Sequence, residues 1–334
     1  MVTIRDVAKR AGVTIGTVSR VFNHYPKLLP ETVEKVERAA RELRYIPNAN
    51  ARSLSSKRPP NLCLIASGLL GGDDRDAMTG ICLKGILEYT TSNGLEMSLY
   101  CTDSQTQTQM SFTDYCRRHA VSCAIVTGIK TDDPYFVELV TSGIPVVGID
   151  LPIEGEHAGW VSVDNAAASR EAVEILFSHG MKKLLIVAGK SNAAVNTERL
   201  RGVHAAFKRA GLPLPPVVHA DFDEEKAYRT ALERFAGGER PDAVFCFSDL
   251  MALGVMRAAR EAGLRVPEDL SVMGFDGMPF CAMTQPPLST VRQDMRALGF
   301  EAAHLAHDLM RGRNIREFHR FVPYRPEMRG SVRS

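Results

Sequence analysis

Apolar and polar residues alternate with the period of an α-helix in three short stretches at the start of the chain. The apolar sets are Ile4, Val7, Ala8 and Ala11, then Val18, Val21 and Phe22, then Val33, Val36, Ala40 and Leu43. Spacings of three and four residues place each set on one side of a helix. Gly12 favours the left-handed conformation that ends a helix, and Thr14 is a good N-cap for the next one. The pattern therefore predicts three helices, the first two joined by a tight turn.

Two short helices around a turn that contains glycine form the helix-turn-helix unit, whose second helix enters the major groove of DNA. Its outer face here would carry Ile15, Gly16, Thr17, Ser19 and Arg20. An ordinary helical hairpin with a polar outer face has the same spacing. Periodicity alone does not decide between the two interpretations.

From Asn61 onward, short apolar runs alternate with amphipathic helices. The expected strands are Leu62–Ala66, Met97–Tyr100, Cys123–Val126, Pro145–Ile149, Leu184–Ala188, Val217–Ala220, Ala243–Phe247 and Ser271–Gly274. The expected helices include Ala166–His179, Glu198–Ala210, Lys226–Ala236 and Leu250–Ala262. Alternation of this kind indicates parallel, doubly wound sheets, and eight or more strands suit two sheets better than one.

Between the two regions, Pro47 could open a short helix from Asn48 to about Ser55. So short a helix is not stable alone, because isolated helices need roughly 12–15 residues. The segment is therefore either a plain linker ending in Pro59 and Pro60 or a helix that forms only when something holds it.

Charge is unevenly distributed along the chain. The net charge is +2, but residues 1–60 contain 12 Lys and Arg against 5 Asp and Glu, so the remaining 274 residues carry −5. A basic head on an acidic body is typical of a protein whose head contacts phosphates.

Several function classes are not supported by the chain's composition. With 45% hydrophobic residues but no apolar run of 18 residues, no membrane span is expected, and no signal peptide is recognised. Seven cysteines without C-x-x-C pairs indicate reduced thiols in a cytoplasmic protein, with no disulfide frame, metal site or cofactor. A-G-K-S at 188–191 lacks the glycine that a phosphate-binding loop needs at position 184, which is Leu. No nucleophile or metal motif predicts an enzyme.

Candidate ligand-binding residues follow the predicted strands, because open parallel sheets bind ligands beyond the carboxyl ends of their strands. They are Asp150, Arg199, Phe222, Ser248, Asp249 and Asp276, with Arg199 expected to begin its helix. Carboxylates with one arginine suit vicinal hydroxyl groups, and an aromatic ring can stack on a sugar or a base. Each acidic residue could alternatively be a helix cap.

The opening stretch resembles the DNA-binding signature A-x-x-A-G-V-[ST]-x-x-T-V-S-R-V-x-N of the lactose/galactose repressor (LacI/GalR-type) family of bacterial transcriptional regulators. The matching residues are Ala8, Ala11, Gly12, Val13, Thr14, Thr17, Val18, Ser19, Arg20, Val21 and Asn23. Leu29 departs from the Ser or Thr that the family has before Pro30, so the cap of the third helix should be weak. V-S-V-D-N at 161–165 and P-P-L-S-T-V-R-Q at 286–293 resemble the family's effector domain.

The resemblance implies an α/β fold: an all-α helix-turn-helix head and a two-lobed, periplasmic-binding-protein-like effector domain built from Rossmann-like parallel sheets. The implied regions are the head at 1–46, a hinge at 47–60 and the effector-binding and dimerisation domain at 61–334. Its lobes would be 61–161 with 291–321, and 162–290 with 322–334, so that the chain crosses between them near Ser162, Val291 and Phe321.

Residues of the head are expected to contact DNA in two ways. Ile15, Gly16 and Arg20 should face base edges, and Thr14, Thr17, Ser19 and Asn23 should hold phosphates. The segment with Ala51 and Leu54 resembles the family's hinge helix, in which two subunits pair in the minor groove and a leucine wedges between base pairs. A homodimer is expected on a pseudo-palindromic site, since one recognition helix buries too little surface.

The resemblance also implies effector roles. Arg199 and Asp276 match the family's most regular effector contacts, Phe222 its stacking aromatic and Asp150 a hydroxyl acceptor. Ser248 replaces the common Asn, and Asp249 should be structural, holding the start of its helix. The family's D-x-x-N-P-F-F after the first strand is absent, so Asp73 or Asp74 would have to substitute.

These observations predict a sequence-specific DNA-binding transcriptional regulator, a repressor, whose operator affinity is controlled by a sugar or polyol bound between two lobes. A purine is the alternative effector. A solute-binding protein and an enzyme of sugar metabolism are the alternative classes.

Overall fold

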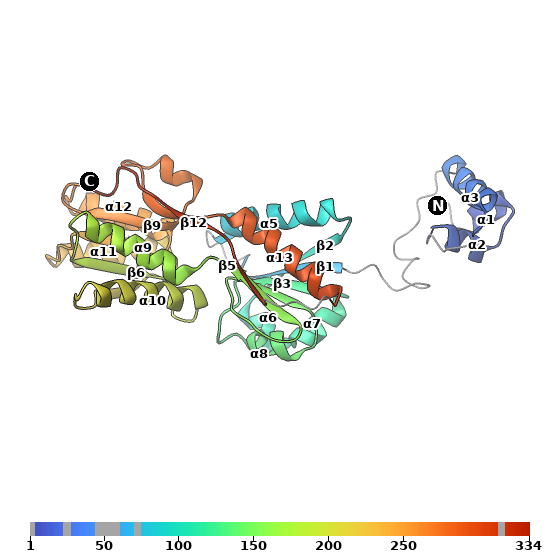
Figure 1. Cartoon of the computed structure of the whole chain (residues 1–334), viewed down its shortest axis with the longest axis horizontal. Helices are drawn as coiled ribbons and strands as arrows, with labels where there is room; N and C mark the ends of the chain where they lie inside the picture. Colours follow the sequence, from blue (N-terminus) through green and yellow to red (C-terminus); the bar gives the residue numbers. More distant parts are fainter. Residues whose placement is uncertain (1–3, 23–27, 44–60, 70–74, 313–317) are drawn as a thin grey trace. The chain divides into compact units, whose positions relative to one another are not determined.

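The computed structural model describes residues 4–22, 28–43, 61–69, 75–312 and 318–334 (Figure 1). Contacts divide the chain into two compact units, Met1–Pro59 and Pro60–Ser334. We call them the head and the body and describe each by itself.

The head consists of three helices, as the apolar spacing predicted. They are α1 (Ile4–Ala11), α2 (Ile15–Phe22) and α3 (Pro30–Glu42). Val7, Val18 and Val36, one from each helix, are fully buried at its centre. Gly12 adopts a φ of +69° between α1 and α2, which is the conformation the tight turn requires.

The first sheet of the body has six parallel strands in the order β11-β5-β4-β3-β1-β2. Their bounds are β1 (Asn61–Ser67), β2 (Glu96–Thr102), β3 (Cys123–Thr127), β4 (Val146–Ile149), β5 (Ala158–Ser162) and β11 (His319–Phe321). The helices around it are α5 (Arg75–Ser92), α6 (Ser104–Gln109), α7 (Phe112–Arg118), α8 (Pro134–Thr141) and α13 (Met295–Met310). Together these elements form the first lobe.

Two glycines allow α5 and α13 to pack closely. A Cβ on Gly85 would lie 1.9 Å from the carbonyl oxygen of Arg296, and one on Gly299 would lie 1.9 Å from that of Cys82. The helices α5 and α13, which are far apart in the sequence, are thereby packed together in the first lobe.

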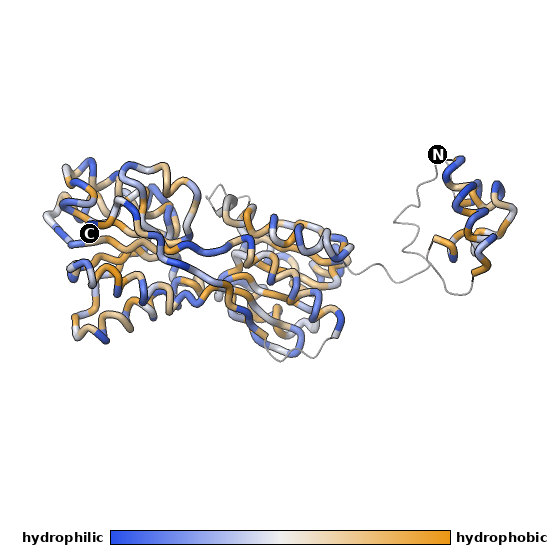
Figure 2. Tube along the Cα trace, turned by 45° about the horizontal axis from the view of Figure 1, so that its top comes forward, coloured by the Kyte–Doolittle hydropathy of each residue, from blue (hydrophilic) through white to orange (hydrophobic). Residues whose placement is uncertain are grey.

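The second sheet also has six strands, in the order β12-β10-β9-β8-β6-β7, parallel except for β12 against β10. They are β6 (Leu184–Ala188), β7 (Val217–His219), β8 (Ala243–Cys246), β9 (Ser271–Asp276), β10 (Ser289–Gln293) and β12 (Tyr324–Glu327). With α9 (Asn165–Ser178), α10 (Ala194–Arg209), α11 (Glu224–Ala236), α12 (Asp249–Glu261) and the 3₁₀ helix η1 (Pro279–Ala282), they form the second lobe. Hydrophobic residues follow the sheets in both lobes, and hydrophilic ones follow the outer turns (Figure 2).

The chain passes between the lobes at three places among the described residues. β5 ends at Ser162 in the first lobe, and α9 begins at Asn165 in the second. β10 ends at Gln293 in the second lobe, and α13 begins at Met295 in the first. The third passage joins β11 to β12.

The two-sheet α/β fold was predicted correctly, but four strands were missed. β5, β10, β11 and β12 read A-G-W-V-S, S-T-V-R-Q, H-R-F and Y-R-P-E, and the last three are not runs of apolar residues. β11 and β12 lie at sheet edges, where polar side chains are tolerated.

Candidate functional site

The outer face of α2 is open to solvent in the head. Ile15, Gly16 and Arg20 are exposed, Ile15 to 44%, although a large apolar side chain normally avoids water. Val18 and Val21 face the core instead. Thr17 and Ser19 are half-buried at the border of this face.

Thr14 is the N-cap of α2, as its position suggested. Its Oγ1 accepts a hydrogen bond from the backbone N–H of Thr17 at 3.1 Å and lies 2.9 Å from the hydroxyl of Thr17. The first turn of α2 is therefore fixed beside the exposed residues.

Charge on the head is distributed between α3 and α2. Glu34 and Glu37 pair with Arg38 and Arg41 along α3. Among the ion pairs of the described part of the head, none includes Arg20. Asn23, Ala51 and Leu54 lie outside the described residues, as does Asp73 in the body.

A cavity of about 150 Å³ lies between the two lobes of the body. Five sequence-predicted residues line it: Asp150, Arg199, Phe222, Ser248 and Asp276. Apolar side chains supply much of the remaining wall, among them Met78, Ile129, Ile149, Val195, Leu250 and Met295. The cavity therefore combines a few polar groups with an apolar wall, as small-molecule sites do.

Asp150 follows β4 in the first lobe, adopts a φ of +58° and lines the cavity. The hydroxyl of Ser162 donates to its Oδ1 at 2.5 Å. Burial raises the pKa of Asp150, while the bond from Ser162 and the charge of Arg199 act in the opposite direction.

Arg199 is the central residue of the second lobe's wall. It lies in the second turn of α10, which begins at Ala194, so the expectation that Arg199 begins its helix was wrong. Its Nε donates to Asn165 Oδ1 at 2.8 Å, its Nη1 donates to the carbonyl oxygen of Phe247, and its guanidinium stacks 3.7 Å from the centre of the Phe275 ring. Burial lowers the pKa of Arg199, and Asp276 and Asp150 oppose that shift.

Asp276 ends β9 opposite Arg199. One of its oxygens, Oδ1, lies 3.8 Å from Arg199 Nη2 and accepts a hydrogen bond from Gln293 Nε2 at 2.9 Å. Burial raises the pKa of Asp276 well above its ordinary value, and Arg199 offsets part of that rise. Together with Asp150, this pair offers charged donors and acceptors to hydroxyl groups of a ligand.

Phe222 and Ser248 complete the predicted set. Phe222 has a φ of +64°, and its ring lies over Gly189. Ser248 is the N-cap of α12: its Oγ accepts from the backbone N–H of Met251 at 3.2 Å and retains its own proton to donate. The cap of α12 is therefore Ser248, and the neighbouring Asp249, for which a helix cap was the alternative role, does not cap this helix.

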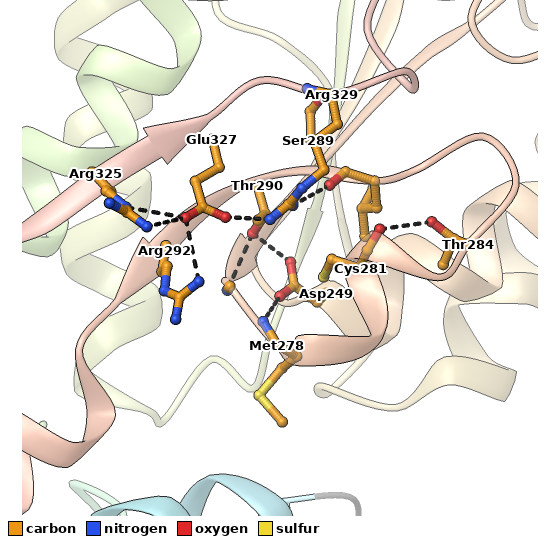
Figure 3. Close-up of polar contacts among 12 residues, drawn as sticks. Asp249, Met278, Cys281, Thr284, Ser289, Thr290, Arg292, Arg325, Glu327 and Arg329 are labelled. Atoms are coloured by element: carbon orange, nitrogen blue, oxygen red, sulfur yellow. Dashed lines mark hydrogen bonds and ion pairs between the residues drawn. The ribbon is translucent and has the colours of Figure 1, made fainter.

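Asp249 is structural, but it does not cap its own helix. The side chain is fully buried and accepts hydrogen bonds from the Met278 backbone N–H at 2.7 Å and from Thr290 Oγ1 at 2.5 Å (Figure 3). It fastens the start of α12 to the connection after β9 and to β10. Burial raises its pKa to about 6.

Sequence reasoning missed two lysines of the cavity wall, Lys130 and Lys190. Each lies shortly after a predicted strand, so the rule that identified Asp150 would also have found them. Lys190 belongs to A-G-K-S, in which Gly189 makes room for Phe222 instead of cradling a phosphate. Lys130 Nζ donates to Ser104 Oγ at 3.0 Å.

Two loops of opposite lobes are hydrogen-bonded beside the cavity. The backbone N–H of Thr131 donates to the carbonyl oxygen of Asn192 at 3.0 Å, and Asn192 Nδ2 lies 3.0 Å from both carboxylate oxygens of Asp132. Asp133 holds the first loop by accepting from the Lys130 backbone N–H at 2.9 Å and from Ser104 Oγ at 2.6 Å. We call the contact among Thr131, Asp132 and Asn192 the clasp.

Neither a metal site nor a membrane span is found in the part of the chain that the structure describes. Among the described residues, no three His, Cys, Asp or Glu side chains lie together where they could hold a metal ion. No described helix combines the length and the hydropathy that a bilayer crossing needs.

Two family models match the chain. Residues 3–48 match bacterial regulatory proteins of the lacI family, and residues 173–332 match a periplasmic binding protein-like domain. The HTH-type transcriptional regulator CelR of Thermobifida fusca is 31% identical over 314 residues, which cover 93% of this chain and 92% of that protein.

Two solved structures are similar over nearly the whole chain. The lac repressor dimer bound to operator and the anti-inducer ONPF has a TM-score of 0.86 at 27% identity and covers 100% of this chain and 99% of its own. The complex of CelR with cellobiose has a TM-score of 0.73 at 28% identity and covers 99% of this chain and 100% of its own.

Proposed function

The chain belongs to the LacI family of bacterial regulatory proteins, and we propose on that basis that it is a transcriptional repressor that binds operator DNA with sequence specificity. A small molecule bound between its lobes controls the operator affinity. The observation that carries this proposal is the presence in one chain of an exposed, capped α2 and of an interlobe cavity lined by Asp150, Arg199 and Asp276.

The DNA contacts divide into two kinds. Ile15, Gly16 and Arg20 read base edges in the major groove: Arg20 pairs with a guanine, and Ile15 packs against a thymine methyl group. Thr14, Thr17, Ser19 and Asn23 hold phosphates and set the position of α2. The exposure of Ile15 and Arg20 supports the first assignment.

The repressor acts as a homodimer on a pseudo-palindromic operator. One α2 buries too little surface for tight binding, and two-fold symmetry of the protein matches two half-sites of DNA. Ala51 and Leu54 enter the minor groove from paired hinge helices, with Leu54 wedged between base pairs. The lac repressor, similar over the whole chain, is a dimer on its operator.

The effector is a neutral sugar or a polyol. Asp150 and Asp276 accept hydrogen bonds from hydroxyl groups, Arg199 and Ser248 donate to them, and Phe222 stacks on the apolar face of a sugar ring. CelR, with a similar fold, binds cellobiose. A purine stacked on Phe222 is the second candidate, favoured by the same ring. Asp73 supplies a further acceptor.

The protein is a regulator and not an enzyme. CelR, which is similar over nearly the whole chain, is a transcriptional regulator, and this supports the assignment. A repressor that binds operator DNA acts in the cytoplasm. A solute-binding protein would have the same kind of body, but its function would not require a DNA-binding helix such as α2.

DNA selection from a fragmented genomic pool tests the function. The purified full chain should enrich fragments that share one palindromic sequence, and Arg20→Ala should lose that enrichment. If no common sequence were recovered although circular dichroism showed that the chain is folded, the repressor assignment would be contradicted.

A thermal-shift screen tests the effector class with D-glucose, D-ribose, cellobiose, sorbitol, adenine and guanine as probes. A ligand at 100 times its dissociation constant should add about 2.7 kcal/mol of stability. Stabilisation by a sugar or sorbitol, lost in Asp276→Asn, is expected. Stabilisation by adenine or guanine alone would replace the sugar with a purine.

A further inference from the structure

The polar residues of the cavity belong to a longer chain of contacts that runs through the body. In order, its members are Asp150, Ser162, Asn165, Arg199, Asp276 and Gln293. All but Asp150 are at most 4% exposed, so water cannot readily replace their mutual contacts. We call this set the polar chain.

The polar chain joins the cavity wall to two of the passages between the lobes. Ser162 is the last residue of β5 and Asn165 the first of α9, so both lie at the first passage. Gln293 is the last residue of β10, at the second passage. Asp150, Arg199 and Asp276 line the cavity. The side chains that face a ligand are thus linked by hydrogen bonds and an ion pair to residues at the two passages, about which the lobes would turn.

Asn165 uses all of its amide in this arrangement. Its Nδ2 donates to Ser162 Oγ at 3.0 Å and to the carbonyl oxygen of Val163 at 3.2 Å. Its Oδ1 accepts from Arg199 Nε. A displacement of the arginine therefore either pulls the first passage with it or breaks a buried hydrogen bond, which is unfavourable.

Gln293 fixes the other member of the charged pair. Its Nε2 donates to Asp276, while its Oε1 is buried and meets no hydrogen-bonding partner in the described part of the body. The Gln293 side chain is therefore held in place chiefly by its hydrogen bond to Asp276. The stacking of the Arg199 guanidinium on the Phe275 ring leaves that group little freedom to absorb a shift by itself.

We propose that Asn165 and Gln293 are positioning residues that transmit a change at Arg199 and Asp276 to the two interlobe passages. The inference rests on the proposed function only in taking these two residues as effector contacts. An effector that moves the charged pair would then change the angle between the lobes through Ser162–Asn165 on one side and Gln293 on the other.

The polar chain can be cut at defined links. Asn165→Asp keeps the acceptor for Arg199 but replaces the donor that faces Ser162 and Val163. Ser162→Ala removes the hydroxyl between Asp150 and Asn165. Ser169→Ala is the matched control, since Ser169 is also fully buried on α9 but its hydroxyl makes no hydrogen bond with the described residues.

Hydrogen–deuterium exchange of the full chain tests the proposal without DNA or effector. Asp276→Asn, a change at the cavity, should raise exchange of the backbone amides at 160–167 by about fivefold or more, roughly the size of one coupled contact. In the Asn165→Asp background the same change should add less than about twofold, because the connection is already cut. Ser162→Ala should behave like Asn165→Asp, and it serves as the test if Asn165→Asp fails to fold.

The result that overturns the proposal is equally specific. If Asp276→Asn left exchange at 160–167 unchanged, or raised it by the same factor with and without Asn165→Asp, the two sites would be independent. A uniform rise that includes β6 and β8, matched by Ser169→Ala, would show a general loss of stability instead of transmission. Because no operator is involved, these outcomes are separate from failure of the repressor assignment.

Discussion

The ring of Phe222 lies directly over Gly189, so closely that a Cβ on Gly189 would be 2.0 Å from Cζ of the ring. Phe222 itself adopts a φ of +64°, and the preceding Asp221 one of +56°. The imidazole Nδ1 of His219 lies 2.8 Å from the carbonyl oxygen of Gly189 and holds the two segments together. The position of the stacking ring in the cavity therefore depends on the absence of a side chain at 189.

Gly189→Ala should displace Phe222 from the cavity wall. Overpacking of this kind costs about 1–3 kcal/mol, and the body should unfold at a lower temperature. Thermal unfolding, alone and with the best ligand of the screen, measures both losses. Gly237→Ala is the control, because Gly237 has a φ of −72° and a Cβ there would be 3.4 Å from its nearest neighbours. Equal melting temperatures for the two variants would contradict the assigned role of Gly189.

Asn192→Asp should open the clasp. The substitution replaces an amide donor by a second carboxylate opposite Asp132, so a hydrogen bond becomes a repulsion. Exchange of the amides at 128–133 and 189–193 should rise, and ligand should dissociate faster. Asn192→Ser, which removes the donor amide without adding charge, should have a smaller effect. If the two variants exchange alike, the charge at this position is irrelevant to closure.

Leu29→Ser should stabilise α3. Leu29 is the N-cap residue, is 72% exposed, has extended backbone angles and supplies no side-chain hydrogen bond, as the sequence comparison with the family suggested. A serine there can accept from the first turn, which is worth about 1 kcal/mol. Slower exchange at 30–43 in the full chain would show the gain. Leu29→Ala shortens the side chain without adding a cap and should give no slowing.

Arg20→Ala should weaken operator binding by about 1–3 kcal/mol and relax discrimination at one base pair. Arg38→Ala is the matched control, because Arg38 is also exposed but pairs with Glu34 on α3. Binding to the selected operator and to single-base variants distinguishes the two. Uniform weakening across all sequences would make Arg20 a phosphate contact instead of a base contact.

The body should become more stable as the pH falls from 7 toward 4.5. Burial raises the pKa of Asp249 from 3.8 to about 6, so the folded state takes up a proton before the unfolded state does. The associated stability is present at low pH and is lost as the pH rises through about 6; for this group it amounts to roughly 2 kcal/mol. The raised pKa values of Asp150 and Asp276 act in the same direction.

Urea unfolding of the full chain at several pH values measures this dependence. Asp249→Asn should remove much of it. Asp269→Asn is a control of opposite sign, because the Arg265 side chain holds the pKa of Asp269 below its ordinary value, so its contribution disappears as the pH falls. A wild-type curve that parallels that of Asp249→Asn would contradict the assigned shift.

Much of the protein follows from local sequence. The spacing of Val7, Val18 and Val36 determines three helices with one shared core, and Gly12 and Thr14 determine the turn between the first two, because periodicity and backbone preference act within a few residues. Strands such as Leu184–Ala188 are evident for the same reason, as fully buried parallel strands must be apolar throughout.

Candidate site residues at the ends of strands could also be predicted from the sequence, since parallel strands all present their carboxyl ends to one edge of the sheet. This rule predicted from the sequence that Asp150, Arg199 and Asp276 lie at one crevice, and the three residues line the same cavity. It could not say that Ser248 caps α12 while Asp249 turns inward to Met278, because two adjacent polar residues have the same local preferences and differ only in what the fold places beside them.

Tertiary structure alone decided the contacts between distant segments. Asn165 meets Arg199, and Gln293 meets Asp276, only because two sheets bring the ends of β5, β9 and β10 together around α10. The edge strands β11 and β12 have no apolar pattern of their own and become strands by pairing with β5 and β10. Hydrogen bonds to a neighbouring strand, unlike burial of a side chain, leave no periodic trace in the sequence.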